Sequence, residues 1–203
     1  MPEIANRRPL KARNTRWAAG LARLLLKTRL TPNAVSVGGI GFAAIGAACF
    51  LFAPRWPALW LGGALCVQLR LLANLMDGLL AVEGGRKSAS GPLYNEFPDR
   101  IEDTLLLVAA GYGAGVPVLG WAAAVLAMGT AYVRALGGAV GLTQQFCGPM
   151  AKQHRMALLT LGAVASLFVP AMPWVLAIIC AGAAITCVRR MMRYADALRV
   201  AAR

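Results

Sequence analysis

The chain has 203 residues, 59% of them hydrophobic, and a mean hydropathy of +0.61. This composition is more apolar than that of ordinary soluble domains and indicates a membrane protein. The formal net charge is +13; eight Lys and Arg residues precede residue 32, and five more lie between Arg189 and Arg203. Basic residues placed in this way suit anionic lipid headgroups, so nucleic acid is not expected as a partner.

An amphipathic helix is expected at residues 15–29, ahead of the first apolar segment. At about 100° per residue, its basic side chains share one face, whereas Trp17 and Leu24 lie on another. Helices of this kind are typical of segments that lie in the membrane interface. We therefore expect a basic cytoplasmic N-terminus with an interfacial helix (1–31), followed by one membrane domain (32–203).

Six apolar segments follow, and a membrane-crossing helix needs roughly 20 residues. They are approximately 33–53, 57–82, 98–116, 118–141, 156–172 and 174–190. Loops two and four carry Lys and Arg residues, whereas loops one, three and five carry only Arg55. By the positive-inside rule, both termini and loops two and four lie in the cytoplasm. The expected fold is an all-α bundle of six transmembrane helices, in the inner membrane of a bacterium.

Acidic residues are concentrated between the second and third spans. Six of the chain's eight acids lie in a window of 27 residues: Asp77, Glu83, Glu96, Asp99, Glu102 and Asp103. Carboxylates at membrane depth are costly and usually mark ion, proton or substrate sites. The window therefore predicts the functional site, on the cytoplasmic side.

Two polar stripes run through this window. On the second span, Asn74, Asp77 and Ala81 share one helical face. After the turn, Asn95 and Asp99 form a second stripe, although a third span that began only at Pro98 would leave Asn95 in the turn. Facing each other, the stripes offer only oxygen ligands, which suit Mg²⁺, Mn²⁺ or Ca²⁺ better than zinc.

The spacing of these residues resembles the signature of the CDP-alcohol phosphatidyltransferase family, D-x2-D-G-x2-A-R-x8-G-x3-D-x3-D. In this chain the same spacing reads Asn74-x2-Asp77-Gly78-x2-Ala81-Val82-x8-Gly91-x3-Asn95-x3-Asp99. Members of that family have six spans behind an N-terminal interfacial helix. They transfer a phosphatidyl group from a CDP-linked lipid to an alcohol and release CMP. The resemblance therefore implies an enzyme of phospholipid biosynthesis.

The resemblance also implies roles for individual residues. A divalent cation, Mg²⁺ or Mn²⁺, would be bound as one or two ions by Asn74, Asp77, Asn95 and Asp99. The nucleotide would lie against Gly78, Ala81 and Gly91, and against Asn74 and Asp77. Asp99 would also be the base that takes the proton of the acceptor hydroxyl. A homodimer is expected on the resemblance alone.

Three positions depart from the family signature. Asn74 and Asn95 stand in place of Asp, and Val82 stands in place of Arg. The formal charge at the four metal positions falls from −4 to −2, which weakens metal binding unless other acids compensate. The candidates for compensation are Glu83, Glu96 and Glu102. Alternatively, the site holds one metal ion rather than two.

Basic residues farther along the chain are candidates for the acceptor site. Arg134 lies inside the fourth span, where a buried arginine usually meets an anion. Lys152 and Arg155 lie in loop four, where the positive-inside rule alone would also explain them. In the resembling family such residues bind the acceptor, often a phosphorylated polyol, and we assign that role to Arg134, Lys152 and Arg155.

Two other functions compete with the transferase. The substitutions Asn74 and Asn95 favour a catalytically silent relative that binds a CDP-lipid or a metal ion and regulates a membrane partner. A small cation carrier would also need an acidic site within the membrane. Such carriers commonly have duplicated halves, however, whereas the acids here are confined to one pair of segments.

Overall fold

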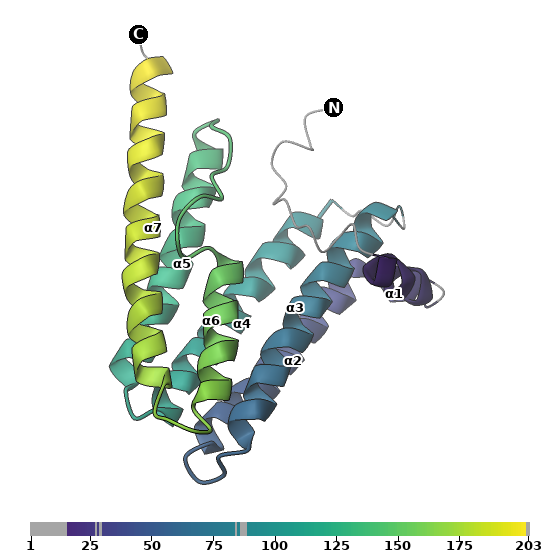
Figure 1. Ribbon diagram of the computed structural model, residues 1–203. Coiled ribbons are helices and arrows are strands. Elements are labelled where there is room, and N and C mark those ends of the chain that lie inside the picture. The colour runs from purple at the N-terminus through teal and green to yellow at the C-terminus, as the bar shows by residue number, and fades with distance from the viewer. Residues whose placement is uncertain (1–15, 27, 29, 84, 86–88, 202–203) are drawn as a thin grey trace.

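The computed structural model describes residues 16–26, 28, 30–83, 85 and 89–201. Throughout these ranges the regular structure is helical, as predicted (Figure 1). The helices are α1 (Arg16–Leu26), α2 (Pro32–Phe52), α3 (Leu59–Glu83), α4 (Gly91–Gly113), α5 (Pro117–Ala139), α6 (Lys152–Ala165) and α7 (Met172–Ala201).

Local sequence signals set several of the helix ends. Thr31 caps α2, because its hydroxyl accepts a hydrogen bond from the Ala34 amide at 3.1 Å, and Pro32 follows at the first helical position. Gly115 separates α4 from α5 with a φ of 73°, a value that favours glycine. Because α4 begins at Gly91 and continues through Pro98, Asn95 lies on the same helix as Asp99.

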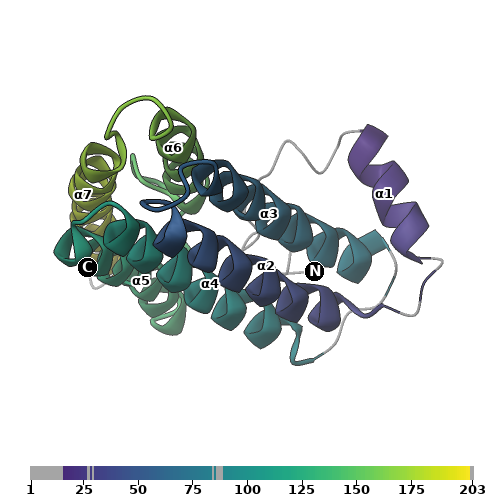
Figure 2. The same cartoon turned by 90° about the horizontal axis from the view of Figure 1, so that it is seen from below.

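The helices from α2 to α7 form a closed ring in which each one packs against two principal neighbours. The order around the ring is α2, α4, α5, α7, α6 and α3. Figure 2 shows α2 lying between α3 and α4. Helices α3 and α4 follow one another in sequence, but their backbones make little direct contact. Their polar side chains meet inside the ring, as Arg70 of α3 and Glu102 of α4 do.

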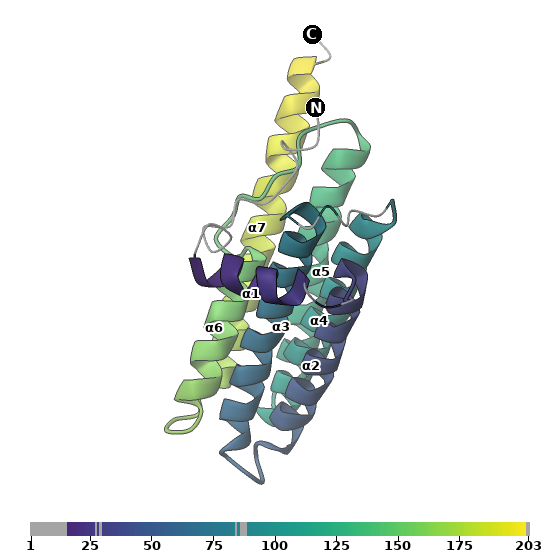
Figure 3. The ribbon, with the colours of Figure 1, turned by 90° about the vertical axis from the view of Figure 1, so that its right-hand side faces the viewer.

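The short helix α1 crosses the bundle close to α3 (Figure 3). Leu21 and Leu25 pack against the buried side chains of Leu75, Met76 and Leu79. Trp17 and Leu24 are exposed, as expected for an apolar surface that meets lipid. A helix is therefore present within residues 15–29, and its place in the membrane interface stays a prediction.

In the part of the chain that the structure describes, four helices are long and apolar enough to cross a membrane: α2, α3 through Ala81, α5 and α7. This number defines a multi-pass membrane protein. Helix α4 has the length of a span, but charged side chains occupy it from Glu96 to Asp103, at its middle. Helix α6 has 14 residues, fewer than the roughly 20 that a bilayer requires. Four of the six predicted spans therefore correspond to helices that could cross a membrane, and the count of six stays a prediction.

The half of the bundle opposite the acidic window is packed by shape. Phe50 lies against Trp60 with ring centroids 5.6 Å apart, and a Cβ on Gly63 would overlap the Phe50 ring. Helices α4 and α5 touch at two glycines, since a Cβ on Gly120 would lie 2.9 Å from the Gly111 Cα. This half forms a close-packed base for the polar half.

Candidate active site

The two halves of the motif meet where α3 faces α4. The Asn74 amide donates a hydrogen bond to Oδ1 of Asp99 at 2.5 Å. One turn after Asn74, Asp77 is buried and accepts a hydrogen bond from the Ser36 hydroxyl of α2, also at 2.5 Å. The structure thus brings three of the four candidate metal positions together, whereas the fourth, Asn95, is exposed near the start of α4.

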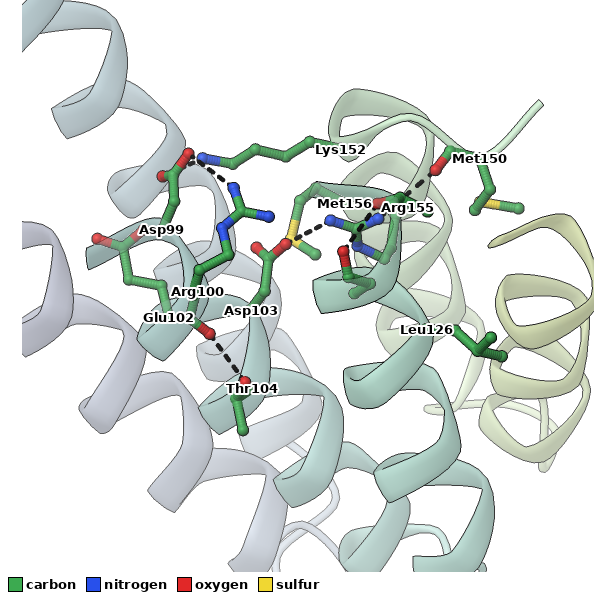
Figure 4. A network of polar contacts seen from close by, with 12 residues as sticks. Asp99, Arg100, Glu102, Asp103, Thr104, Leu126, Met150, Lys152, Arg155 and Met156 are labelled. Carbon is green, nitrogen blue, oxygen red and sulfur yellow. Dashed lines mark hydrogen bonds and ion pairs between the residues drawn. The ribbon is translucent and has the colours of Figure 1, made fainter. Parts of the chain in front are cut away.

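Asp99 is surrounded by positive charge. Lys152, the first residue of α6, reaches across to contact its carboxylate (Figure 4). The Arg70 guanidinium lies 3.6 Å from Oδ1, and that of Arg100 lies 3.5 Å from Oδ2. Burial lowers the pKa of the Lys152 ammonium to about 8, and the nearby Asp99 carboxylate opposes that shift.

A buried network of charges continues below Asp99. Arg70 is fully buried and pairs with Glu102 at 2.8 Å and with Asp103. Asp103 also pairs with Arg155, which hydrogen-bonds to the Met150 carbonyl at 3.5 Å (Figure 4). A single carboxylate thus joins helices α3, α4 and α6. The partners of Arg70 are thus acids of α4, and Asp77 instead accepts its hydrogen bond from Ser36 of α2.

Two carboxylate oxygens in the site lack a hydrogen-bond partner in the described part of the chain, namely Oδ1 of Asp77 and Oε1 of Glu102. A Cβ on Gly39 of α2 would overlap Oε1 of Glu102 and lie 3.6 Å from the side-chain oxygen of Asn74. The missing side chain at Gly39 therefore leaves room for these oxygens. Unpaired, buried oxygens are costly unless a cation binds them, so the donor set fits a hard divalent ion.

Carboxylates alone do not complete a metal cage in this arrangement. Within the described residues, no group of three His, Cys, Asp or Glu side chains is placed to hold a metal ion. An ion at Asp77 and Glu102 thus needs further oxygens, such as the amide oxygen of Asn74 or oxygens of a substrate.

The other two proposed compensating acids lie elsewhere. Glu96 is half-exposed and pairs with Arg134 at 2.5 Å, so its charge is already matched. Glu83 is the last residue of α3, and its side chain lies outside the described part of the structure. Glu102 is therefore the candidate that the structure places beside Asn74 and Asp99.

The three small residues among the five nucleotide-site candidates lie on either side of the turn between α3 and α4. Gly78 is buried next to Asp77, and Ala81 lies one turn later on α3. Gly91 is the first residue of α4. All three offer little side-chain bulk, which leaves space for a ligand to approach the backbone. Their contact with a nucleotide stays a prediction.

The predicted acceptor residues all have partners in the structure. Arg134 donates to Gln144 at 2.7 Å and lies over the Phe146 ring, 5.4 Å from its centroid. Lys152 contacts Asp99, and Arg155 contacts Asp103. Lys152 is thus the one of the three that touches the proposed catalytic carboxylate.

A stripe of polar residues on α7, which the sequence reasoning missed, holds the segment between α5 and α6. Thr186 accepts a hydrogen bond from the Met150 amide at 3.0 Å, and Tyr194 accepts one from the Gln145 amide at 2.8 Å. Arg190 donates to the Cys147 carbonyl at 2.9 Å. Their spacing of four residues in an otherwise apolar helix is the signal that could have identified them.

The chain was compared with known proteins. A scan against models of protein families finds no match. Among curated proteins, the chain is 30% identical over 190 residues to the phosphatidylinositol phosphate synthase of Cutibacterium acnes, covering 85% of this chain and 89% of that protein. It is 26% identical over 151 residues to the phosphatidylinositol phosphate synthase of Streptomyces avermitilis, covering 71% of this chain and 60% of that one.

Solved structures show the same fold. The phosphatidylinositol phosphate synthase of Mycobacterium tuberculosis with CDP-DAG bound matches with a TM-score of 0.77 and 24% identity, over 89% of this chain and 94% of that one. The same synthase in complex with manganese and citrate matches with a TM-score of 0.76 and 24% identity, over 87% of this chain and 88% of that one.

The similarity across most of the chain, together with the ring of apolar helices, defines an integral-membrane enzyme of phospholipid biosynthesis. The chain belongs to the CDP-alcohol phosphatidyltransferase family. Its activity is the transfer of a phosphatidyl group from a CDP-linked lipid to an alcohol acceptor.

Proposed function

We propose that this enzyme transfers the phosphatidyl group of CDP-diacylglycerol to a phosphorylated polyol of the inositol phosphate class, assisted by Mg²⁺ or Mn²⁺. Support for the acceptor comes from the two curated relatives, which are synthases of phosphatidylinositol phosphate. Support for the donor and the cation comes from solved relatives, one with CDP-DAG bound and one with manganese.

The cation site would include Asp77, Asn74 and Glu102. Among the described residues, Oδ1 of Asp77 and Oε1 of Glu102 are the unpaired oxygens of the site, and the Asn74 oxygen lies near the latter, beside Gly39. When bound there, a divalent ion offsets the charge of the diphosphate and polarises the phosphorus that is attacked. The small residues Gly78 and Gly91 would let the nucleotide approach the backbone, since each leaves space where another side chain would project.

Asp99 acts as the base. It takes the proton of the acceptor hydroxyl as that oxygen attacks the phosphorus that carries the diacylglycerol. A new P–O bond forms to the acceptor, the bond to the bridging diphosphate oxygen breaks, and CMP leaves with its electron pair. Asn74 and Lys152 both contact the Asp99 carboxylate, and they fix the direction in which it points.

The acceptor phosphate would be bound by basic residues of α5 and α6. Arg134 is buried, and its partner Glu96 is half-exposed, so an incoming phosphate can replace that carboxylate. Lys152 places a second positive charge next to Asp99. Arg155 is buried in an ion pair with Asp103, so it would act on the acceptor phosphate through its charge rather than by direct contact.

Helices α4 and α6 complete six membrane passages in this proposal, with the site and both termini on the cytoplasmic face of a bacterial inner membrane. Support comes from basic residues at one end of the bundle, because Arg86 and Lys87 follow α3 and Lys152 and Arg155 lie in the first turn of α6. The connections at the other end carry only Arg55, as the positive-inside rule requires. The polar half of α4 lies inside the ring, where charged groups are tolerated because they pair with one another.

The observation that carries the proposal is the hydrogen bond from Asn74 to Asp99, which joins the two halves of the motif across α3 and α4. The test is CMP release by the purified protein, with CDP-diacylglycerol, Mg²⁺ or Mn²⁺ and a series of polyol phosphates. The variant Asp99→Asn is expected to lower the rate about 10²- to 10⁴-fold, because it removes the base.

The matched control is Asp196→Asn on α7, which is expected to leave the rate unchanged. The Asp196 side chain is 70% exposed and, among the described residues, pairs with Arg199 alone, at 3.5 Å. If Asp99→Asn releases CMP at the wild-type rate, Asp99 is not the base. If the wild-type protein releases CMP with none of the acceptors, the result would favour a catalytically silent relative, as Asn74 and Asn95 suggest.

A further inference from the structure

We infer that the site binds a single divalent cation, on the side of Asp77 and Glu102, and that the Lys152 ammonium takes the place of a second cation at Asp99. The inference rests on the proposed metal-assisted transfer. It accounts for the two negative charges that Asn74 and Asn95 remove from the family signature, because a site with fewer carboxylates needs fewer metal ions to balance its charge.

Asp77 is the carboxylate of the proposed cation site that no positively charged side chain contacts in the described part of the chain. It is 4% exposed, and in the described part of the chain no Lys or Arg side chain forms an ion pair with it. Its Oδ2 bonds to the neutral Ser36 hydroxyl, and its Oδ1 has no hydrogen-bond partner there. A buried carboxylate in this condition is costly until a cation neutralises it.

Glu102 supplies a second oxygen on the same side. It is fully buried, and while Oε2 pairs with Arg70, Oε1 is left without a hydrogen bond. The side-chain nitrogen of Asn74 donates to Asp99 and, at 3.4 Å, to Oε2 of Glu102. The side-chain oxygen of Asn74 and Oε1 of Glu102 both lie beside Gly39. Oxygens from α3 and α4 thus converge at a place where α2 carries no side chain.

The Asp99 side differs because its charge is already matched. Lys152 contacts the carboxylate directly, and Arg70 and Arg100 lie within 3.6 Å of it. Where the family signature has a carboxylate, Asn74 donates a hydrogen bond to Asp99 instead. A second metal ion would have to displace the ammonium and then find an amide nitrogen rather than a ligand oxygen.

The test counts Mn²⁺ bound to the full-length protein in detergent, with bound and free ion distinguished by electron paramagnetic resonance. One ion per chain is expected, with the spectrum of an isolated ion. Two ions per chain would lie about 4 Å apart, as in two-metal sites, and their spin coupling would overturn the inference. The absence of any bound ion would overturn the proposed cation assistance as well.

Two pairs of variants locate the ion and the lysine. Glu102→Gln is expected to raise the Kd for Mn²⁺ at least tenfold, whereas the matched Glu96→Gln, at a carboxylate paired with Arg134, leaves it unchanged. Lys152→Gln is expected to admit a second, spin-coupled ion, whereas Lys152→Arg retains a count of one.

An unchanged Kd in Glu102→Gln, or a count of one in Lys152→Gln, would overturn the corresponding half of the inference. Glu102 also pairs with Arg70, so its variant can fail to fold. Lys152→Gln then carries the test, because the second ion that it admits must bind beside the first. CMP release by the wild-type protein checks the proposed function independently of these counts.

Discussion

The two halves of the helix ring are held together by different forces. In one half, Phe50 packs under Trp60, and α4 meets α5 at Gly111 and Gly120, so the geometry depends on volume. In the other half, α3, α4 and α6 are joined by ion pairs that centre on Asp103, so the geometry depends on charge balance. The comparison teaches that a close-packed apolar half supports a site whose helices are joined mainly by ion pairs.

The largest effect is expected from removing the central carboxylate of the charged half. Asp103→Asn leaves the Arg70 and Arg155 guanidinium groups buried without their shared counter-charge. The free energy of unfolding should fall by about 3–5 kcal/mol, the usual result of breaking a buried ion pair. Denaturant or thermal unfolding in detergent measures this loss. The exposed pair of Asp196 provides the control, since Asp196→Asn should cost less than about 1 kcal/mol.

A smaller loss is expected from adding volume to the apolar half. In Gly120→Ala the new methyl group would meet the Gly111 Cα at 2.9 Å and force α4 and α5 apart. Such overpacking costs about 1–3 kcal/mol, measured by the same unfolding experiment. Gly41→Ala is the matched control, because nothing lies within 4 Å of a Cβ built there. An equal loss in both variants would mean that helix contact is not the cause.

The smallest effect is expected where α7 holds the segment before α6. Tyr194→Phe removes the hydroxyl that accepts a hydrogen bond from the Gln145 amide at 2.8 Å. The loss should be about 1 kcal/mol, the usual net value of one hydrogen bond. Because this segment leads to Lys152, the KM for the acceptor should rise more than kcat falls. Tyr132→Phe, on the exposed face of α5, should change neither constant.

Much of the architecture could be predicted from the sequence because the signals are local. The expected segment 33–53 corresponds to α2, and 118–141 corresponds to α5, since prolines and glycines mark their ends. The motif spacing likewise predicted that the stripe of Asn74 and Asp77 would face that of Asn95 and Asp99, and the structure shows one contact between the stripes, the hydrogen bond from Asn74 to Asp99. The start of α4 was placed too late, at residue 98, because its first two turns are too polar to read as a membrane span.

The pairing of charges could not be predicted, because it joins residues far apart in sequence. Arg155 was interpreted as an acceptor residue, and the structure shows its contact with Asp103, 52 positions earlier. Periodicity places such residues on a helical face, but only the order of helices around the ring decides which faces meet. The same limit applies to Lys152 and Asp99, whose contact joins α6 to α4, two helices that are not neighbours in the ring.

The bonds from α7 to the α5–α6 segment bear on how this protein can evolve. Thr186, Arg190 and Tyr194 each bond to a main-chain amide or carbonyl of the segment. Every amino acid except proline offers both groups, so the segment can exchange its own side chains while the path of its backbone is retained. A lineage can therefore change the side chains next to Arg134, such as Gln144, by point substitution in this segment without rebuilding the membrane bundle around it.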